Sequence, residues 1–474
     1  MLDFKLESYA RSDIYPFHMP GHKRQPVFVM DPYAVDITEI DGFDNLHAPE
    51  GILKEAQERA ARLYGAGRSY YLVNGSTCGI LAAISAAAPF GGRILMSRNA
   101  HKSVYHAAYL RHLSVEYLNP CITQTGIQGA VPVEEVRRKL KENSDICAVL
   151  VTSPTYEGVV SDIAAISAAV HEYGIPLLVD EAHGAHFGFH PAFPQTAVRL
   201  GADAVIQSMH KVLPSLTQTA LLHLNSDYIL PETVQKYLSV YETSSPSYVL
   251  MAGMEKCIRL LKEKGEALFD AYAARLLKFY NETKQLKKLH VIQRKDFFGE
   301  EIFDLDPSKI VISAKHTKLD GTKLFQRLLS EFHLQMEMSC GFYALGMTSI
   351  MDRDEGFDRL CRALWKIDSD VSPAEEEEPG RLVLKLYAPK EKKLELYQAM
   401  DLPVEKIPFD QAVGRISGSM VSIYPPGIPI LIPGEKIDSD FIKNIRKSIL
   451  HHLNLQGIAD IRNEQINVVN FEKM

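Results

Sequence analysis

The chain has 474 residues, of which 46% are hydrophobic and 23% are charged, and its formal net charge is −7. This length predicts more than one domain, and the composition excludes a disordered or fibrous protein. The mild acidity argues against a nucleic-acid-binding surface and against a polybasic membrane patch. No apolar stretch is long enough to cross a bilayer, and the first residues lack the apolar core of a signal peptide, so we expect a cytoplasmic protein.

The predicted elements begin with an irregular arm over residues 1–30, where Pro20-Gly21 forbids a continuous helix. From about Leu46 to Leu224, short apolar runs alternate with amphipathic stretches, a pattern typical of a parallel sheet covered by helices. Five runs are predicted as buried strands: 93–97, 148–152, 176–180, 204–207 and 220–224. Between two of them, 161–173 is predicted as a helix with Ser161 as its cap and Gly174 as its stop.

The later part of the chain changes in composition. Residues 254–264 are helix-like and charged, and 308–313 read as a strand, so a second domain is expected near residue 300. The charged segment 374–380 ends in Pro-Gly and marks a break before a final part that contains a Pro-rich stretch at 424–430. The predicted domains are an arm at 1–30, a large α/β domain at 31–300, a small α+β domain at 301–375 and a C-terminal domain at 376–474.

Three pieces in a fixed order carry the chemistry: Asn74-Gly-Ser-Thr77, Val179-Asp-Glu-Ala-His183 and Ser208-Met-His-Lys211. Together they offer an anion site at a helix start, a carboxylate at a strand end and an amine, which are the groups that pyridoxal phosphate needs from a protein. Each piece alone has an ordinary alternative: a plain helix cap, a carboxylate that caps the next helix, and a solvated surface lysine. Lys211 lies 31 residues beyond Asp180, which leaves room for one helix and one strand in between.

The chain resembles the ornithine/lysine/arginine decarboxylase family, which has the aspartate-aminotransferase-like fold (PLP fold type I) with a mixed, mostly parallel sheet. The resemblance spans nearly the whole chain and is closest to the short form, which lacks the N-terminal receiver-like domain of larger members. The matching segments are Phe17-His-Met-Pro-Gly-His-Lys23, Asp44-Asn-Leu-His-Ala-Pro-Glu50, Asn74-Gly-Ser-Thr77, Arg98-Asn-Ala-His-Lys-Ser103, Ser153-Pro-Thr-Tyr-Glu-Gly158, Asp180-Glu-Ala-His183, Ser208-Met-His-Lys211 and Tyr424-Pro-Pro-Gly-Ile-Pro429.

The resemblance implies a role for each residue at the site. Lys211 would carry pyridoxal phosphate as a Schiff base, Asp180 would pair with the pyridine nitrogen, and His101 would stack on the ring. A carboxylate there keeps the ring positively charged, so that the ring accepts the electron pair left when carbon dioxide departs. The phosphate would be bound by Ser76, Thr77, Ser208 and His210, and His183 would contact the phenolate side of the cofactor.

Two further groups of residues are candidates for partner and substrate contacts. The stretch Tyr241-Glu-Thr-Ser-Ser-Pro-Ser247 resembles the family segment that reaches the phosphate of a neighbouring subunit, so Thr243 or Ser244 would complete a composite site in a homodimer; its alternative is a hydroxyl-rich turn. A basic substrate needs an acidic partner for its side chain. The candidates for that partner are Asp41, Asp44, Glu50, Glu157 and Glu435.

The resemblance favours arginine as the substrate, then lysine, then ornithine, in polyamine biosynthesis. The alternatives are an aminotransferase or aldolase-type reaction on the same cofactor, or a non-catalytic regulatory protein that binds it. No metal site is expected, since Pro20-Gly21 separates His18 from His22 and no H-E-x-x-H motif occurs. The six cysteines form no C-x-x-C pair and are expected mostly in the core, in reduced form.

Overall fold

A seven-stranded sheet forms the centre of the computed structural model, which describes residues 1–27, 30–121, 123, 125, 127–297, 299, 301–374, 385–424, 427–450 and 454–473. β9 runs antiparallel to both of its neighbours, and the other neighbouring strands are parallel. This confirms the predicted α/β fold. The strand order is β2 (Arg68–Leu72), β9 (Ala220–Leu224), β8 (Ala204–Gln207), β7 (Leu177–Asp180), β5 (Ile146–Thr152), β3 (Arg93–Ser97) and β4 (Ser114–Leu118).

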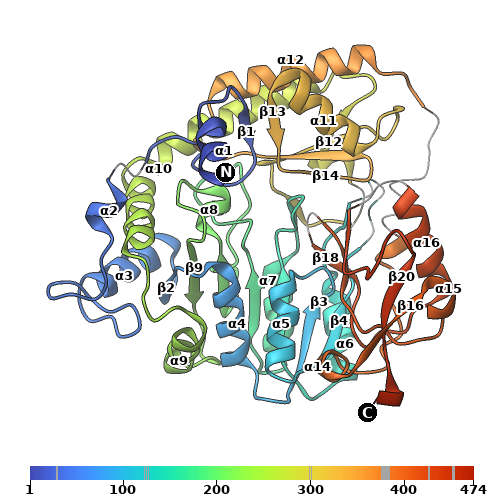
Figure 1. The fold of residues 1–474 in the computed structure, drawn as a ribbon. Coiled ribbons are helices and arrows are strands. Elements are labelled where there is room, and N and C mark those ends of the chain that lie inside the picture. Colours follow the sequence, from blue (N-terminus) through green and yellow to red (C-terminus); the bar gives the residue numbers. More distant parts are fainter. Residues whose placement is uncertain are drawn as a thin grey trace.

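All five predicted strands are in this sheet, and helices cover both of its faces (Figure 1). Successive strand residues point to opposite faces, so Ile94 and Met96 pack in one layer and Leu95 in the other. One layer contains α4 (Gly75–Ala87), α5 (Lys102–Leu110) and α9 (Pro231–Tyr241), and the other contains α6 (Val133–Glu142) and α7 (Ile163–His171). Four of the six cysteines are buried, as expected: Cys78, Cys257, Cys340 and Cys361.

Two local predictions in this domain are wrong. The cap of α7 is Asp162, whose side chain accepts from Ala165 N–H, while the Ser161 hydroxyl accepts from Val131 N–H instead. No helix lies between Asp180 and β8, where the chain makes a series of turns. Two prolines, Pro191 and Pro194, and the positive φ of Gly188 break that stretch, and its turns pack around the buried carboxylate of Glu181.

The arm is more regular than predicted. It contains α1 (Leu2–Ala10) and β1 (Tyr15–Phe17), and β1 pairs in parallel with β13 (Leu334–Met336). The sequence pattern missed α1 because none of its residues is buried, so the helix has no apolar stripe facing a core. It missed β1 because the partner strand lies far along the chain. Pro20-Gly21 falls after these elements, and residues 18–27 form no helix or strand.

The chain continues through α2 (Pro32–Val35) and α3 (Ile52–Tyr64), and later through the long helix α10 (Tyr248–Thr283), into a second sheet. This sheet has the order β10 (His290–Val291), β12 (Lys309–Ser313), β15 (Tyr343–Met347) and β14 (Met338–Cys340), and it packs with α11 (Gly321–Phe332) and α12 (Asp354–Asp370). A short pair joins β6 (Val159–Val160) to β11 (Asp304–Leu305).

The last part of the chain lies beside the β3–β4 edge of the large sheet (Figure 1), where Lys392 Nζ donates to the carbonyl of Val115. Among the residues described, no helix is long and apolar enough to cross a membrane. The predicted break at 374–380 lies almost wholly outside the described residues, and the division into four domains stays a prediction. The elements of this part are α14 (Leu396–Asp401), α15 (Phe409–Ala412), α16 (Ser439–Leu450), the pair β16 (Val404–Pro408) and β20 (Gln465–Val469), and the sheet β18 (Ile428–Leu431), β17 (Val421–Ile423) and β19 (Leu455–Gln456).

Candidate active site

The predicted site residues gather where strands of the large sheet end. Asp180 is the last residue of β7, and Ser208 follows β8 directly. The short helix α8 (Met209–Val212) then carries Lys211, and α4 begins three residues after β2. Ligands bind beyond the carboxyl ends of the strands in open α/β sheets, so the three sequence pieces meet at the edge where a ligand is expected.

Lys211 is half-buried, and its Nζ lies 3.0 Å from His183 Nε2. Burial lowers the pKa of the Lys211 amine, and the charges of Asp180 and Glu337 raise it in part. Burial likewise raises the pKa of Asp180, against the charge of Lys211 and a hydrogen bond from Ala182 N–H. The alternative of a solvated surface lysine is therefore wrong, and the environment favours an amine that loses its proton readily.

His183 is buried beside Lys211, and the Tyr156 ring lies against it with a centroid distance of 4.5 Å. Burial, followed by the charge of Lys211, holds the pKa of His183 well below its usual range, so the imidazole is neutral. Its Nδ1 is a buried atom with no protein partner. Asn99 Oδ1 after β3 and Thr152 Oγ1 at the end of β5 are also buried and unpartnered. Buried polar atoms are normally paired, so three unpaired ones beyond neighbouring strand ends indicate a polar ligand.

The predicted phosphate contacts converge on the start of α4. Ser76 Oγ and Ser208 Oγ lie 2.6 Å apart, although 132 residues separate them in sequence. Asn74 is the N-cap residue of α4, and its side chain makes no hydrogen bond to the helix, which leaves N–H groups of the first turn open to an anion. Thr77 is exposed beside them. His210 Nδ1 donates to the Thr219 carbonyl at 2.9 Å, so its Nε2 is the nitrogen left for another contact.

His101 occupies the N-cap position of α5, directly after the loop that follows β3. Its Nδ1 accepts from the Ser103 N–H at 3.3 Å and contacts the Ser103 hydroxyl at 2.8 Å, and these contacts orient the ring. The residue is exposed, yet the surrounding protein atoms, and next the charge of Lys211, lower the pKa of His101 to about 4. His101 is therefore a neutral ring at the site rather than an imidazolium.

The carboxylates predicted to bind substrate are in different environments. Asp44 accepts five backbone N–H groups around the start of α3 at 2.8–3.3 Å. Glu435 is paired with Arg98, and Glu157 is buried and accepts from the Tyr343 hydroxyl at 2.6 Å. Asp41 and Glu50 are exposed. None of these contacts tests the predicted substrate roles, which stay predictions.

Thr243 and Ser244 lie in the loop between α9 and α10, where the Thr243 carbonyl contacts His47 Nε2 at 2.8 Å and the Thr243 hydroxyl accepts from Ser245 N–H. Ser244 is exposed. A subunit contact through this loop is likewise a prediction.

No sequence pattern points to Glu337, which lies between β13 and β14. Its carboxylate accepts from the Tyr156 hydroxyl at 2.6 Å and from Met19 N–H at 2.8 Å, and its charge reaches Lys211. Tyr156 lies in the matching segment 153–158 but has no predicted role. A glutamate 126 residues beyond Lys211 in sequence enters the site only through the contact between the two sheets.

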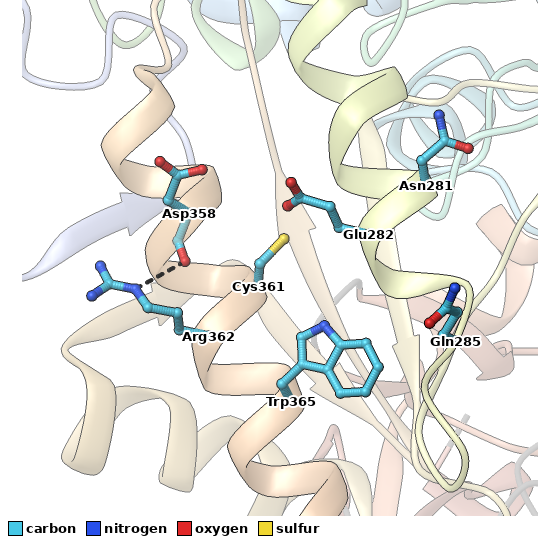
Figure 2. A pocket seen from close by; sticks show the side chains of 7 residues that line it. All are labelled: Asn281, Glu282, Gln285, Asp358, Cys361, Arg362 and Trp365. Atoms are coloured by element: carbon cyan, nitrogen blue, oxygen red, sulfur yellow. Dashed lines mark hydrogen bonds between the residues drawn. The ribbon is translucent and has the colours of Figure 1, made fainter.

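A surface groove of about 720 Å³ between α10 and α12 does not include any of these residues. Figure 2 shows Glu282, Asp358 and Cys361 around it. Lys278 Nζ lies 2.9 Å from the Asp358 carboxylate and 3.9 Å from that of Glu282, so both acids have a cationic partner. Burial raises the pKa of the Cys361 thiol to about 12, which leaves it protonated and unreactive.

Comparison with known proteins gives matches along nearly the whole chain. Residues 2–327 match the family model described as Orn/Lys/Arg decarboxylase, major domain, and 384–453 match the C-terminal domain of the same family. An arginine decarboxylase of Bacillus subtilis is 32% identical over 99% of this chain and 97% of its own length. An arginine decarboxylase of Bacillus anthracis is 31% identical over 98% and 96%.

More distant proteins share the fold. The constitutive lysine decarboxylase of Escherichia coli superposes with a TM-score of 0.80 at 22% identity, covering 99% of this chain and 81% of that one. An alanine–glyoxylate aminotransferase from Nostoc superposes with a TM-score of 0.54 at 14% identity, covering 72% and 99%. These likenesses support the predicted aspartate-aminotransferase-like fold and, at such identities, nothing finer.

Proposed function

We propose that this chain, which belongs to the Orn/Lys/Arg decarboxylase family, decarboxylates L-arginine to agmatine with pyridoxal phosphate as its cofactor. The observation that carries the proposal is the Lys211 amine, which lies 3.0 Å from a neutral histidine and near a buried aspartate at the carboxyl edge of the sheet. Arginine is favoured over lysine because the relatives named arginine decarboxylase match this chain at higher identity than those named lysine decarboxylase.

The residues fit this cofactor. Lys211 would bind its aldehyde carbon, Asp180 would pair with the ring nitrogen, and His101 and His183 would contact the ring and its phenolate. Ser76, Thr77, Ser208 and His210 would bind its phosphate. When bound, pyridoxal phosphate supplies a ring that accepts the electron pair released with carbon dioxide. The unpartnered Nδ1 of His183 and the adjacent hydroxyls of Ser76 and Ser208 are the features that such a polar, phosphate-bearing group would satisfy.

The protonation states of the three side chains Asp180, Lys211 and His101 suit them to different roles. The buried Asp180 carboxylate would hold a proton on the ring nitrogen, because attraction between the negative carboxylate and a protonated nitrogen would offset the cost of burial. Lys211, whose pKa is lowered, takes and returns protons at Nζ and would deliver one to the substrate α-carbon. His101, held neutral and oriented by Ser103, would keep the ring plane fixed.

Recognition of the substrate side chain requires a carboxylate. Glu337 joins the five predicted candidates, because it and Asp180 are the carboxylates whose charges raise the pKa of Lys211. We also propose a cytoplasmic homodimer in which Thr243 or Ser244 approaches the cofactor phosphate of the other subunit. Polyamine biosynthesis is the process that an arginine decarboxylase of this kind would serve.

The test is incubation of the purified protein and pyridoxal phosphate with arginine, lysine and ornithine separately. We expect stoichiometric carbon dioxide and agmatine from arginine, measured by chromatography of the amines. If cadaverine from lysine or putrescine from ornithine is the main product, lysine or ornithine is the substrate in place of arginine. A keto acid without carbon dioxide would refute decarboxylation in favour of transamination.

Lys211→Ala should abolish amine production and the visible absorbance of the bound cofactor together, because in the described part of the site no other amine contacts the His183 imidazole. Lys236→Ala, an exposed lysine on α9, is the matched control and should change neither. Continued amine production by Lys211→Ala would contradict the assigned role.

A further inference from the structure

A chain of buried hydrogen bonds crosses four neighbouring strands beneath the candidate site. It runs from Ser69 on β2 to His223 on β9, to Gln207 on β8, and to Glu181 just after β7. The distances are 2.7 Å, 3.1 Å and 2.6 Å in that order. Each of these side chains is at most 5% exposed, so water does not compete for the bonds. The order of the links is the order of the strands in the sheet.

The direction of the bonds is set at the Glu181 end. The Glu181 carboxylate accepts from Gln207 Nε2, from the Thr196 hydroxyl at 2.7 Å and from Ala197 N–H at 2.7 Å. Burial raises the pKa of Glu181 to about 7, against the three donors, which lower it in part. All three partners are donors, so the ionised carboxylate acts only as an acceptor. With its amide nitrogen donating to Glu181, Gln207 accepts through Oε1 from His223 Nε2–H, and His223 Nδ1 accepts from Ser69. Each link therefore depends on a carboxylate at position 181.

The two residues joined by the 2.6 Å bond each adjoin a residue of the site. Asp180 precedes Glu181, and Ser208 follows Gln207. Because successive residues of extended chain point to opposite sides, Asp180 faces the site while Glu181 faces the packed side. The Glu181 N–H also donates to the Ile206 carbonyl at 2.9 Å, which continues the pairing of β7 with β8 past Asp180.

We propose that Glu181 is a positioning residue: through Gln207 it fixes the distance between Asp180 and the segment Ser208–Lys211. That distance determines whether the ring and the phosphate of one cofactor can be bound at the same time. The proposal rests on the proposed function, since it assigns Asp180 and Ser208 to two ends of one cofactor. A displacement of about 1 Å between such groups is enough to cost on the order of 100-fold in rate.

The primary variant is Glu181→Gln, which keeps the side-chain size but places an NH₂ group among donors. We expect the Kd of the cofactor-free protein for pyridoxal phosphate, followed by absorbance, to rise by about 10-fold or more, and kcat to fall with a smaller change in KM. The double variant Glu181→Gln/Gln207→Glu restores an amide–carboxylate pair between the same positions. It should recover most of the cofactor affinity.

Asp203→Asn is the matched control. Asp203 is also buried and joins β7 to β8, but at their amino ends, where its carboxylate accepts from Leu177 N–H at 2.8 Å and from the Ser226 hydroxyl at 2.7 Å. We expect this variant to lower the thermal midpoint of the cofactor-free protein without changing the Kd. If Glu181→Gln fails to fold, Gln207→Met removes the same link and is measured in its place.

A Kd that rises no more in Glu181→Gln than in Asp203→Asn would reduce Glu181 to a stability residue and overturn the inference. So would a folded double variant that regains no affinity. A wild-type protein that takes up no pyridoxal phosphate would instead refute the proposed function, and the two failures are thereby distinguished.

Discussion

Lys309 is a lysine with only 1% of its surface exposed, and it lies directly behind the site. Its Nζ is 3.3 Å from the Asp306 carboxylate and donates to the His183 carbonyl at 3.3 Å. The other Asp306 oxygen contacts His186 Nε2 at 3.1 Å. This buried cluster therefore holds the backbone of the histidine that contacts Lys211.

Asp306→Asn should destabilise the protein by about 3–5 kcal/mol at pH 7, because it leaves the Lys309 charge buried without an anionic partner. A lower urea midpoint of the cofactor-free protein is the measurement. Asp270→Asn, an exposed acid paired with His190 at the surface, is the control and should shift the midpoint little.

The stability lost in Asp306→Asn should depend on pH. Burial alone would raise the pKa of Asp306, but the charges of His186 and Lys309 hold it well below its usual range. A carboxyl group whose pKa is lowered by folding contributes stability that is full above its unfolded pKa, about 4, and is lost as the pH falls through its folded pKa. The difference between wild type and Asp306→Asn should thus shrink as the pH falls below about 4. A difference that grows there would contradict this account.

Sequence reasoning finds the residues of the site that follow strands. Asp180 and Ser208 are predicted from short apolar runs with clear ends, and the structure brings them to one edge. Glu337 and Lys309 have no such signal. Lys309 is on β12 and Glu337 lies between β13 and β14, and each is an ordinary charged residue in sequence until the fold brings it next to the large sheet.

The arm acts as an element that supports the helix carrying Lys211. Gly21 N–H donates to the His210 carbonyl at 2.7 Å, and the Gly21 carbonyl accepts from the Ser349 hydroxyl at 2.6 Å. A Cβ at Gly21 would lie 2.7 Å from the backbone N and O of Leu213. Only glycine allows the arm to approach α8 this closely.

Gly21→Ala should therefore displace α8 and Lys211. We expect the affinity for pyridoxal phosphate and kcat to fall by about 10-fold or more, since a small shift of a reacting group is costly. Spectroscopic titration of the cofactor gives the affinity.

Gly265→Ala is the matched control, because Gly265 lies inside α10 and an added Cβ there would have no described neighbour within 4 Å outside its own helix backbone. Alanine is the better helix former, so this variant should bind the cofactor normally and be more stable by about 1 kcal/mol. Normal cofactor binding by Gly21→Ala would show that the arm tolerates the added methyl group and that the support is not needed.

The elements are predicted best where burial is complete. The bounds of β3, β8 and β9 agree with the apolar runs, because a strand covered on both faces is apolar throughout and ends where polar residues begin. The turns at 181–203 and helix α1 are missed for opposite reasons. The turns pack around a buried carboxylate, which no apolar pattern reveals, and α1 buries nothing.

On the scale of the whole molecule, the C-terminal part is joined to the large sheet by a buried ion pair. Arg98 Nη2 contacts both oxygens of Glu435 at 3.1 and 3.2 Å, and Nη1 donates to the Pro429 carbonyl at 3.0 Å. Arg98 follows β3 and precedes His101 by three residues, so the pair anchors the loop that carries the predicted ring-stacking histidine.

Removing one charge of this pair should be more destabilising than removing both. Glu435→Leu leaves the Arg98 guanidinium buried without an anionic partner and should cost about 3–5 kcal/mol, whereas Arg98→Met/Glu435→Leu replaces both charges by apolar groups and should cost much less. The urea midpoints of the two variants and of Arg98→Met complete a double-mutant cycle. A double variant as unstable as the sum of the single ones would mean that the two residues act independently. If the double variant is stable but binds pyridoxal phosphate more weakly than wild type, the ion pair serves mainly to hold the His101 loop, and the C-terminal part then contributes to the site through that loop.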